Sequence, residues 1–272
     1  MTPLDLNSSA TRRRAFSMKL SEAVDAVISR AERLAVVRGI VSNLTLNPPP
    51  EEAASRNYIG ASAIGDECAR RVQLDVWAAF HPSAPAINRE PLDEKARVIF
   101  ARGHRTETEM ASWLTSAFDD IRLSTLNLEG YQHGFVTGGG QIRGHADGII
   151  ELARVSKQPM LWETKTLGEK GWSKLWNHGL AKAYPKYDVQ TQMLMAYLDL
   201  PATLFSALNA DTGELYFELA PFDASKAQAA SDRAVHILTA TRAGELLPKA
   251  ADDPTHFVCR FCRFKEECHP AG

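Results

Sequence analysis

Two carboxylates and a lysine within one stretch of the sequence have the types and spacing needed for metal-assisted phosphodiester hydrolysis. Glu163 and Lys165 are two residues apart in a β-type run, so their side chains point to the same face of the expected strand. A hairpin between residues 144–152 and 160–165 would place Asp147 beside them. Carboxylates hold a hard divalent cation that activates water, and a lysine orients that water or offsets charge growing on a phosphate.

The spacing alone leaves two interpretations of this stretch open. In the first, residues 163 and 165 form an ordinary ion pair on a solvated strand face. In the second, they lie on a buried strand, where an acid is costly unless it is paired or bound to metal. The flanking side chains are apolar and favour the second interpretation: Ile149, Ile150, Leu161 and Trp162.

Two motifs in this stretch resemble those of a known superfamily. Residues 144–148 (Gly-His-Ala-Asp-Gly) resemble motif II of the PD-(D/E)XK nucleases in their RecB-like branch, with alanine where proline is common. Residues 162–166 (Trp-Glu-Thr-Lys-Thr) resemble motif III, and the resemblance extends from about Ile59 to Cys268. It implies an α/β fold of the restriction-endonuclease type, in which a central mixed β-sheet is flanked by helices.

A third carboxylate is expected on a helix over Asp93–Phe118. Glu107 points along the apolar side of this helix, which is an unusual place for an acid. Gly103 followed by Glu107 resembles motif I of the family, with Glu107 in the position of the ligand. His104 lies on a different face, and we expect no metal-binding role for it. The apolar side of the helix consists of Met110, Trp113, Leu114 and Phe118.

The resemblance implies a role for each residue of this site. Glu107, Asp147 and Glu163 would hold Mg²⁺ or Mn²⁺. The carbonyl oxygen of Thr164 would be a further ligand of the cation. Lys165 would position or deprotonate the attacking water.

The RecB-like branch carries a Gln-x-x-x-Tyr motif on the helix after the catalytic lysine. Gln190 stands at the expected position, and the resemblance implies that it holds Lys165 or the DNA backbone in place. Leu194 occupies the position of the tyrosine, and Tyr197, one turn further along, is the candidate replacement. Gln192 remains a second candidate for the glutamine.

All four cysteines fit one arrangement. Cys259, Cys262 and Cys268 form a Cys-x-x-Cys pair with a third thiol six residues on, in a tail rich in charged residues, and Cys68 stands far upstream. Core packing does not explain this spacing, and disulfides are rare in cytoplasmic proteins. A four-thiolate metal site is therefore expected, and the spacing accommodates either zinc or an iron–sulfur cluster.

The resemblance distinguishes between these two cofactors. One cysteine before the nuclease core and three after it is the pattern of RecB-like nucleases with a [4Fe–4S] cluster. Such nucleases include the CRISPR-adaptation exonuclease and the clustered nuclease domain of AddB-type helicase–nucleases. The resemblance thus implies an iron–sulfur cluster, with Zn²⁺ as the alternative, that joins the N- and C-terminal segments of the domain.

Residues 1–50 are expected to be separate from the nuclease domain, which comprises residues 51–272. Residues 1–16 lack periodicity, Lys19–Leu44 has the apolar spacing of an amphipathic helix, and residues 47–50 (Asn-Pro-Pro-Pro) form a linker. The other elements expected in the domain are a helix through residues 72–77, a hairpin of residues 203–209 and 214–219, and a helix over residues 224–246.

Composition limits the class of protein. A length of 272 residues with 44% hydrophobic and 24% charged residues suits a soluble α/β domain. No apolar run approaches the roughly 18 residues of a membrane span, so we expect a cytoplasmic protein, or one in the host cytoplasm if a phage encodes it. The net charge of −2 gives no global basic field, so any surface for DNA must be local.

These observations predict a metal-dependent DNA exonuclease that acts in phage recombination or CRISPR-type DNA processing. The alternatives are a structure-specific or restriction-type endonuclease and a non-catalytic DNA-binding or scaffold module. The set of three acids and a lysine disfavours the scaffold. The expected partners are DNA ends and a recombinase or helicase on another chain, because no Gly-x-x-x-x-Gly-Lys-Ser/Thr motif of a motor occurs in this sequence.

Overall fold

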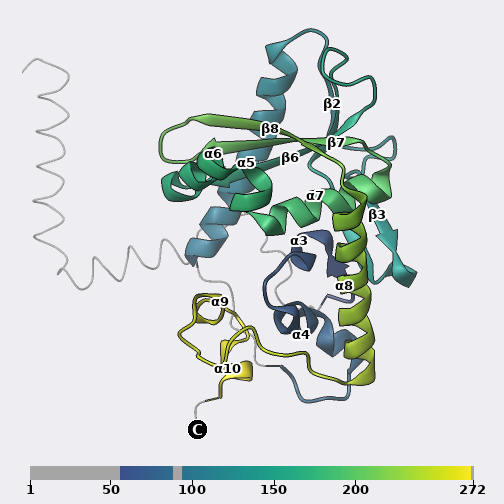
Figure 1. Cartoon of the computed structure of the whole chain (residues 1–272), viewed down its shortest axis with the longest axis vertical. Coiled ribbons are helices and arrows are strands. Elements are labelled where there is room, and N and C mark those ends of the chain that lie inside the picture. The colour runs from purple at the N-terminus through teal and green to yellow at the C-terminus, as the bar shows by residue number, and fades with distance from the viewer. Residues whose placement is uncertain (1–55, 88–93, 271–272) are drawn as a thin grey trace, which may run out of the picture. The chain divides into compact units, whose positions relative to one another are not determined.

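The computed structural model describes residues 56–87 and 94–270 (Figure 1). The arm, helix and linker expected within residues 1–50 lie outside the described residues. The described part is a mixed α/β fold, as expected, with two β-sheets and helices packed against them. No helix within it is long and apolar enough to cross a membrane.

The larger sheet has five strands in the order β2-β5-β6-β7-β8. β6 and β7 run parallel, and all other neighbours in this sheet are antiparallel. β6 is the central strand, and its first five residues are buried because helices cover both of its faces. The strands are β2 (Arg122–Ser124), β5 (Gly148–Glu151), β6 (Met160–Leu167), β7 (Ala202–Asn209) and β8 (Leu215–Pro221).

The expected β7–β8 hairpin is confirmed, and the expected hairpin of residues 144–152 and 160–165 is confirmed for its second half. β5 and β6 pair antiparallel, with Gly148 opposite Trp162 and Ile150 opposite Met160. β7 and β8 also pair antiparallel, within one or two residues of the expected bounds. The alternation of apolar and polar residues therefore located the core of the sheet correctly.

One expected strand is wrong: residues 144–152 do not form a single strand. β4 ends at His145 and belongs to a second sheet of order β1-β4-β3, whereas β5 begins at Gly148. The chain changes sheets at Ala146, whose amide bonds to the carbonyl of His133 (2.8 Å). This change of direction frees Asp147 to turn toward β6. The strands of the second sheet are β1 (Ile59–Gly60), β3 (Gly134–Thr137) and β4 (Ile142–His145), and a short 3₁₀ turn, η1 (Gly138–Gly140), joins the last two.

The long helix α5 (Glu94–Ala117) lies within the expected range of residues 93–118. Met110 and Leu114, two residues of the expected apolar stripe, are buried in one cluster with Trp162 of the larger sheet. Trp113 and Phe118 were expected in the same apolar stripe, but they are 45% and 51% exposed. The stripe is narrower than predicted because only one row of side chains of α5 meets the sheet.

Helices α6 and α7 pack on the other face of the larger sheet. Gly179 breaks α6 with a φ of 71°, a value that glycine adopts without strain. Beyond this break, the amide of Leu180 donates to the carboxylate of Glu218 on β8 (2.7 Å). Pro185 opens α7, where its missing N–H would have no helical partner. The bounds of the two helices are Glu169–Ala183 and Pro185–Leu198.

The remaining helices precede β2 and follow β8 in the sequence. The helix expected through residues 72–77 is confirmed as α4, and the last long helix, α8, ends earlier than expected at Gly244, whose left-handed φ of 73° caps it. The cysteine-rich tail then lies beside the start of α4 (Figure 1). These elements are α3 (Ala61–Ile64), α4 (Ala69–Phe80), α8 (Ala224–Ala243), α9 (Phe257–Arg260) and α10 (Lys265–Cys268).

Candidate active site

The C-terminal half of β6 brings the expected residues together. Glu163 and Lys165 point to the same face, and Lys165 Nζ donates to Glu163 Oε1 and to the carbonyl oxygen of Thr164 (3.0 Å). Asp147 accepts a hydrogen bond from the amide of Thr164 (2.8 Å) and lies 3.7 Å from Lys165 Nζ. Two acids and a lysine therefore share one small volume between the ends of β4, β5 and β6.

Glu163 has one oxygen with partners and one without. The residue is fully buried, and its Oε1 accepts hydrogen bonds from Lys165 and from Gln190 Nε2 (2.7 Å). Its Oε2 is buried and has no hydrogen-bond partner among the described residues. Buried polar atoms in folded proteins are nearly always satisfied. The unpaired Oε2 therefore points to a ligand that the polypeptide does not supply.

Burial and mutual repulsion act against the negative charges of the site. Burial raises the pKa of Glu163 to about 8, Asp147 and Glu107 add to the rise, and Lys165 opposes it. Burial, followed by the charge of Asp147, also raises the pKa of Glu107. For Lys165, burial lowers the pKa, but the two neighbouring carboxylates outweigh this and raise it. When all three acids are ionised, one lysine leaves a surplus of negative charge, which a divalent cation would neutralise.

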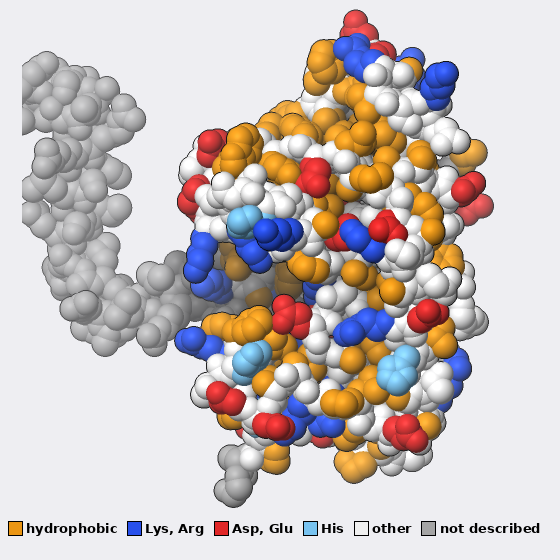
Figure 2. All heavy atoms as spheres, in the orientation of Figure 1, with side chains coloured by type: hydrophobic (Ala, Val, Ile, Leu, Met, Phe, Trp, Pro, Cys, Tyr) orange, Lys and Arg blue, Asp and Glu red, His pale blue; other side chains and the backbone are white. Residues whose placement is uncertain are grey.

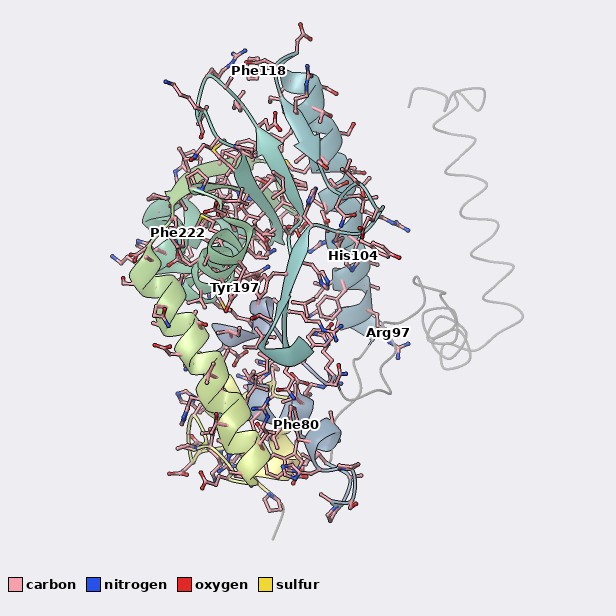
Figure 3. All side chains as sticks on the ribbon, turned by 90° about the vertical axis from the view of Figure 1, so that its right-hand side faces the viewer. Phe80, Arg97, His104, Phe118, Tyr197 and Phe222 are labelled. Carbon is pink, nitrogen blue, oxygen red and sulfur yellow. The ribbon has the colours of Figure 1, made fainter. Side chains whose placement is uncertain are left out.

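Glu107 reaches this group from α5, whereas His104 faces solvent. The side chain of Glu107 is 27% exposed and that of His104 is 78% exposed, with His104 Nδ1 and Glu107 Oε2 3.8 Å apart. Figure 3 places His104 on α5, half-way along the helix. The charges of Asp147 and Glu163 both interact with that of Glu107. The structure thus places the acid, and not the histidine, at the candidate site.

This separation predicts different effects of two neighbouring substitutions. Glu107→Gln should weaken binding of Mn²⁺ about tenfold or more, because it removes a charged ligand but keeps the shape of the side chain. His104→Ala, the matched control on the same turn of α5, should leave the affinity unchanged. Calorimetric titration of both variants with Mn²⁺ measures this difference. The reverse result would assign the ligand to His104.

Two nearby glutamines have different surroundings. Gln190 donates to Glu163, as described above, and is buried at the site. Gln192 faces another direction: its Nε2 donates to the carbonyl of Pro221 (3.1 Å), and its Oε1 accepts from the amide of Asp223 (2.8 Å). Gln192 therefore fixes the connection between β8 and α8, and Gln190 is the glutamine beside the acids.

The two glutamines allow a test in which each serves as the control for the other. Gln190→Ala should lower kcat about tenfold or more, because a lost hydrogen bond to a buried charged group corresponds to about 1.5–3 kcal/mol. Gln192→Ala should lower the melting temperature while kcat per folded molecule is retained. Parallel measurement of kcat and melting temperature separates the two effects. A normal kcat in Gln190→Ala would remove this residue from the site.

The tyrosine expected to complete the glutamine motif is not at the site. Tyr197 stacks on Phe135 with ring centroids 4.2 Å apart, and its hydroxyl lies 3.2 Å from Ser231 Oγ. Tyr197 shares a helix face with Gln190, but seven residues of helix separate the two by about 10 Å along the axis. Figure 3 shows Tyr197 beside α8, where it joins the packing of α7. The expectation that Tyr197 replaces the motif tyrosine is therefore not supported by its position.

Sequence reasoning missed another tyrosine that lies at the site. The ring of Tyr187 is 5.5 Å from Lys165 Nζ, close enough for a cation–π contact. Tyr187 precedes Gln190 by three residues, and residues three apart on a helix lie on one face. That spacing was the available signal, since a helix that presents Gln190 to Glu163 also presents Tyr187 to the neighbouring lysine.

The four cysteines meet in one cavity. Cys68, from the segment before α4, and Cys259, Cys262 and Cys268, from the tail, line the same small cavity. All four are free thiols; Cys68 and Cys259 are buried and the other two are half-buried. Residues 191 positions apart in the sequence are thus brought together.

Cations surround this cavity, which the sequence pattern of the cysteines did not predict. Burial raises the pKa of Cys262, and Arg71 acts to lower it. Burial likewise raises the pKa of Cys268, while Arg70 lowers it by its charge and a hydrogen bond. Because thiolates bind metal, these arginines would stabilise the charged form when a metal is bound. Further lining residues with positive charge are Lys249 and Lys265.

Known proteins resemble this chain only distantly. No protein-family model matches it, and no curated protein matches it. Among solved structures, SSO0001 is 16% identical with a TM-score of 0.47, over 84% of this chain and 94% of that protein. An alkaline exonuclease from Laribacter hongkongensis is 14% identical with a TM-score of 0.48, over 71% of this chain and 92% of its own, and its complex with dAMP gives 0.46. Similarity at this level establishes neither a family nor a function.

The residues of the two sites fit metal, although neither site is a finished coordination shell. Within residues 56–87 and 94–270, no three His, Cys, Asp or Glu side chains converge closely enough to enclose an ion by themselves. At the acidic site, the unpaired Oε2 of Glu163 and the surplus of negative charge fit a divalent cation. In the cysteine cavity, four thiols among cations fit a thiolate-bound metal centre.

Proposed function

We propose that this protein is a metal-dependent deoxyribonuclease that degrades DNA from its ends. The observation that carries the proposal is Glu163. Lys165 and Gln190 hold one of its oxygens, and the other is buried and has no hydrogen-bond partner within the described part of the chain. A buried carboxylate oxygen without a partner is costly, and a bound cation would satisfy it.

Each residue of the site has a proposed part in hydrolysis. Glu107, Asp147 and Glu163 hold Mg²⁺ or Mn²⁺, and the Thr164 carbonyl, which has a second lone pair beside its bond to Lys165, is a further ligand. The bound cation supplies Lewis-acid activation of water and neutralises charge on the scissile phosphate.

Lys165 and Gln190 complete the proposed machinery. Lys165 donates to Glu163 and to the Thr164 carbonyl, so we assign it to positioning or deprotonating the attacking water and to stabilising charge on the phosphate. Gln190 holds the Glu163 carboxylate in place through its 2.7 Å hydrogen bond. Both residues therefore act as positioning and charge-stabilising groups around the phosphate.

Digestion of end-labelled linear DNA and of closed circular DNA, each with and without Mn²⁺, tests the proposal. Loss of linear DNA from its ends, with circles intact and with a requirement for Mn²⁺, is the expected result. Cut circles would select a structure-specific or restriction-type endonuclease instead. Absence of any cleavage while DNA is still bound would select a scaffold module. Phage recombination and CRISPR-type DNA processing, with a recombinase or helicase partner, are the settings that the sequence resemblance implies.

We further propose that the four cysteines bind a [4Fe–4S] cluster, with Zn²⁺ as the alternative. The shared cavity of the four thiols supports a common metal centre. The arginines and lysines around it suit a cluster that carries net negative charge when four thiolates bind it. The choice of iron over zinc rests on the sequence resemblance, and metal analysis of the purified protein decides between them.

A further inference from the structure

The surface of α6 is locally basic in a chain with little net charge. Residues 165–186 contain five lysines and one glutamate, whereas the whole chain has a net charge of −2. Lys170, Lys174, His178 and Lys182 are all exposed along α6. Figure 2 shows blue and pale-blue side chains gathered below α6, at the border of a hollow in the surface. We call these four residues the basic face of α6.

The lysines of the basic face form no ion pairs within the described structure. Among residues 56–87 and 94–270, no carboxylate lies within ion-pair distance of Lys170, Lys174 or Lys182. By contrast, nearby Lys186 is paired with Asp66 (3.0 Å). An unpaired row of cations over several helical turns suits an extended polyanion better than a compact one, which needs convergent donors.

Stacked rings join the basic face to the candidate active site. Lys174 Nζ lies 5.4 Å from the centre of the Tyr184 ring. Tyr184 stacks on Tyr187 with centroids 5.1 Å apart and an angle of 28°, and Tyr187 lies against Lys165. The Lys174 and Lys165 ammonium groups therefore lie at opposite ends of one continuous line of contacts, and each end is held by a cation–π contact.

The position of this line is fixed by the backbone. Tyr184 occupies the break between α6 and α7, and its ring packs against α6 at Gly171. A β-carbon at Gly171 would lie 2.6 Å from the Tyr184 hydroxyl, so a larger residue there would require the tyrosine ring to shift. The basic face thus has a defined place relative to Lys165. A basic face that only kept the helix solvated would not require a line of contacts to Lys165.

We propose that the basic face of α6 binds the phosphate backbone of a nucleic acid strand and directs it along Tyr184 and Tyr187 to Lys165. This inference rests on the proposed nuclease function and names the surface by which the substrate is held. Lys170, Lys174 and His178 follow one another at intervals of four on α6, where β-carbons lie about 5–6 Å apart, and Lys182 follows beyond the break at Gly179. The contacts are to phosphates, so the face adds affinity without sequence preference.

Salt-dependent binding of a fluorescent oligonucleotide, measured by anisotropy without divalent metal, tests this inference. Lys174→Gln and Lys182→Gln should each reduce the slope of log affinity against log salt by about 0.7–0.9. At ~0.1 M salt, each change corresponds to a loss of affinity of about fivefold. Lys157→Gln is the matched control, because Lys157 is equally exposed but lies in the turn between β5 and β6. Lys174→Arg should retain the wild-type slope.

The possible outcomes separate this inference from the proposed function. Unchanged melting temperatures ensure that the variants are folded. If both glutamine variants keep the wild-type slope while the wild-type protein cleaves DNA, the basic face is not the binding surface and the nuclease function stands. If Lys157→Gln lowers the slope as much as Lys174→Gln, binding is diffuse and the inference is wrong. If the wild-type protein neither binds nor cleaves DNA, both the proposed function and this inference are wrong.

Discussion

Lys165→Ala is expected to abolish DNA cleavage while leaving the affinity for Mn²⁺ nearly unchanged. Lys165 contacts Glu163 and Thr164 and lies 3.7 Å from Asp147, so it is central to the site without being a ligand of the cation. Removal of a charge-stabilising group at a phosphate costs about 10²–10³ in kcat, and loss of water positioning adds to this. Single-turnover cleavage of linear DNA, with parallel Mn²⁺ titration, measures both quantities.

The acids of the site provide the contrast for this prediction. Asp147→Ala and Glu163→Ala should lose both cleavage and cation binding, because each removes a ligand. Lys157→Ala, an exposed lysine in the turn before β6, is the control for a general loss of positive charge and should cleave normally. Wild-type cleavage by Lys165→Ala would show that the proposed mechanism is wrong.

The part of the site on β6 was predictable because it depends only on the period of two in a strand. Glu163 and Lys165 must share a face once the segment is a strand, and the apolar residues before them made the strand evident. The hairpin partner β5 then placed Asp147 nearby. Local pattern also located the β7–β8 hairpin and the helices α4, α5 and α8, and the apolar periodicity is strong in α4 and α5.

Other features depend on tertiary contacts that local pattern does not carry. At the separation of β4 from β5, the amide of Ala146 bonds to the carbonyl of His133, which directly precedes β3. The choice between Gln190 and Gln192 requires knowledge of how α7 is rotated, since both residues are buried. Tyr197 appeared to be in line with Gln190 only because angular position along a helix was considered without axial distance.

The cysteine site has one feature that was predictable from sequence and one that depends on tertiary contacts. The spacing of the four cysteines predicted a common site, but the cations around the cavity could not be inferred from the cysteine pattern. Arg70 and Arg71 follow Cys68 directly in the sequence, whereas Lys249 approaches from the segment after α8. Asp66 adds a further link, because it accepts a hydrogen bond from the amide of Cys68 (3.1 Å) and pairs with residues of both α4 and α7. The cavity is therefore built from elements that meet only in the folded chain.

Cys68→Ala is expected to remove the metal centre and to lower the melting temperature strongly. Cys68 and Cys259 are 191 residues apart, so a common cofactor closes a loop around the whole candidate active site. In the chain-entropy model, such a cross-link stabilises the folded state by about 5 kcal/mol. That is comparable to the entire net stability of many domains, which begins at about 5 kcal/mol. Activity should fall through unfolding, because phosphodiester hydrolysis has no redox step.

Metal analysis, absorption spectra and thermal melts of protein purified without oxygen test this prediction. The wild-type protein should be brown with about four irons per chain, as a [4Fe–4S] cluster requires, and Cys68→Ala should be colourless. The control is the metal-free form: once the metal is removed from both proteins, wild type and Cys68→Ala should melt at similar temperatures, because the cofactor and not the thiol supplies the stability. A colourless wild-type protein with one tightly held zinc would overturn the iron–sulfur cluster but keep the cross-link. If Cys68→Ala is as stable as the wild type, both the cluster and the cross-link are wrong, because loss of one ligand would then have cost no stability.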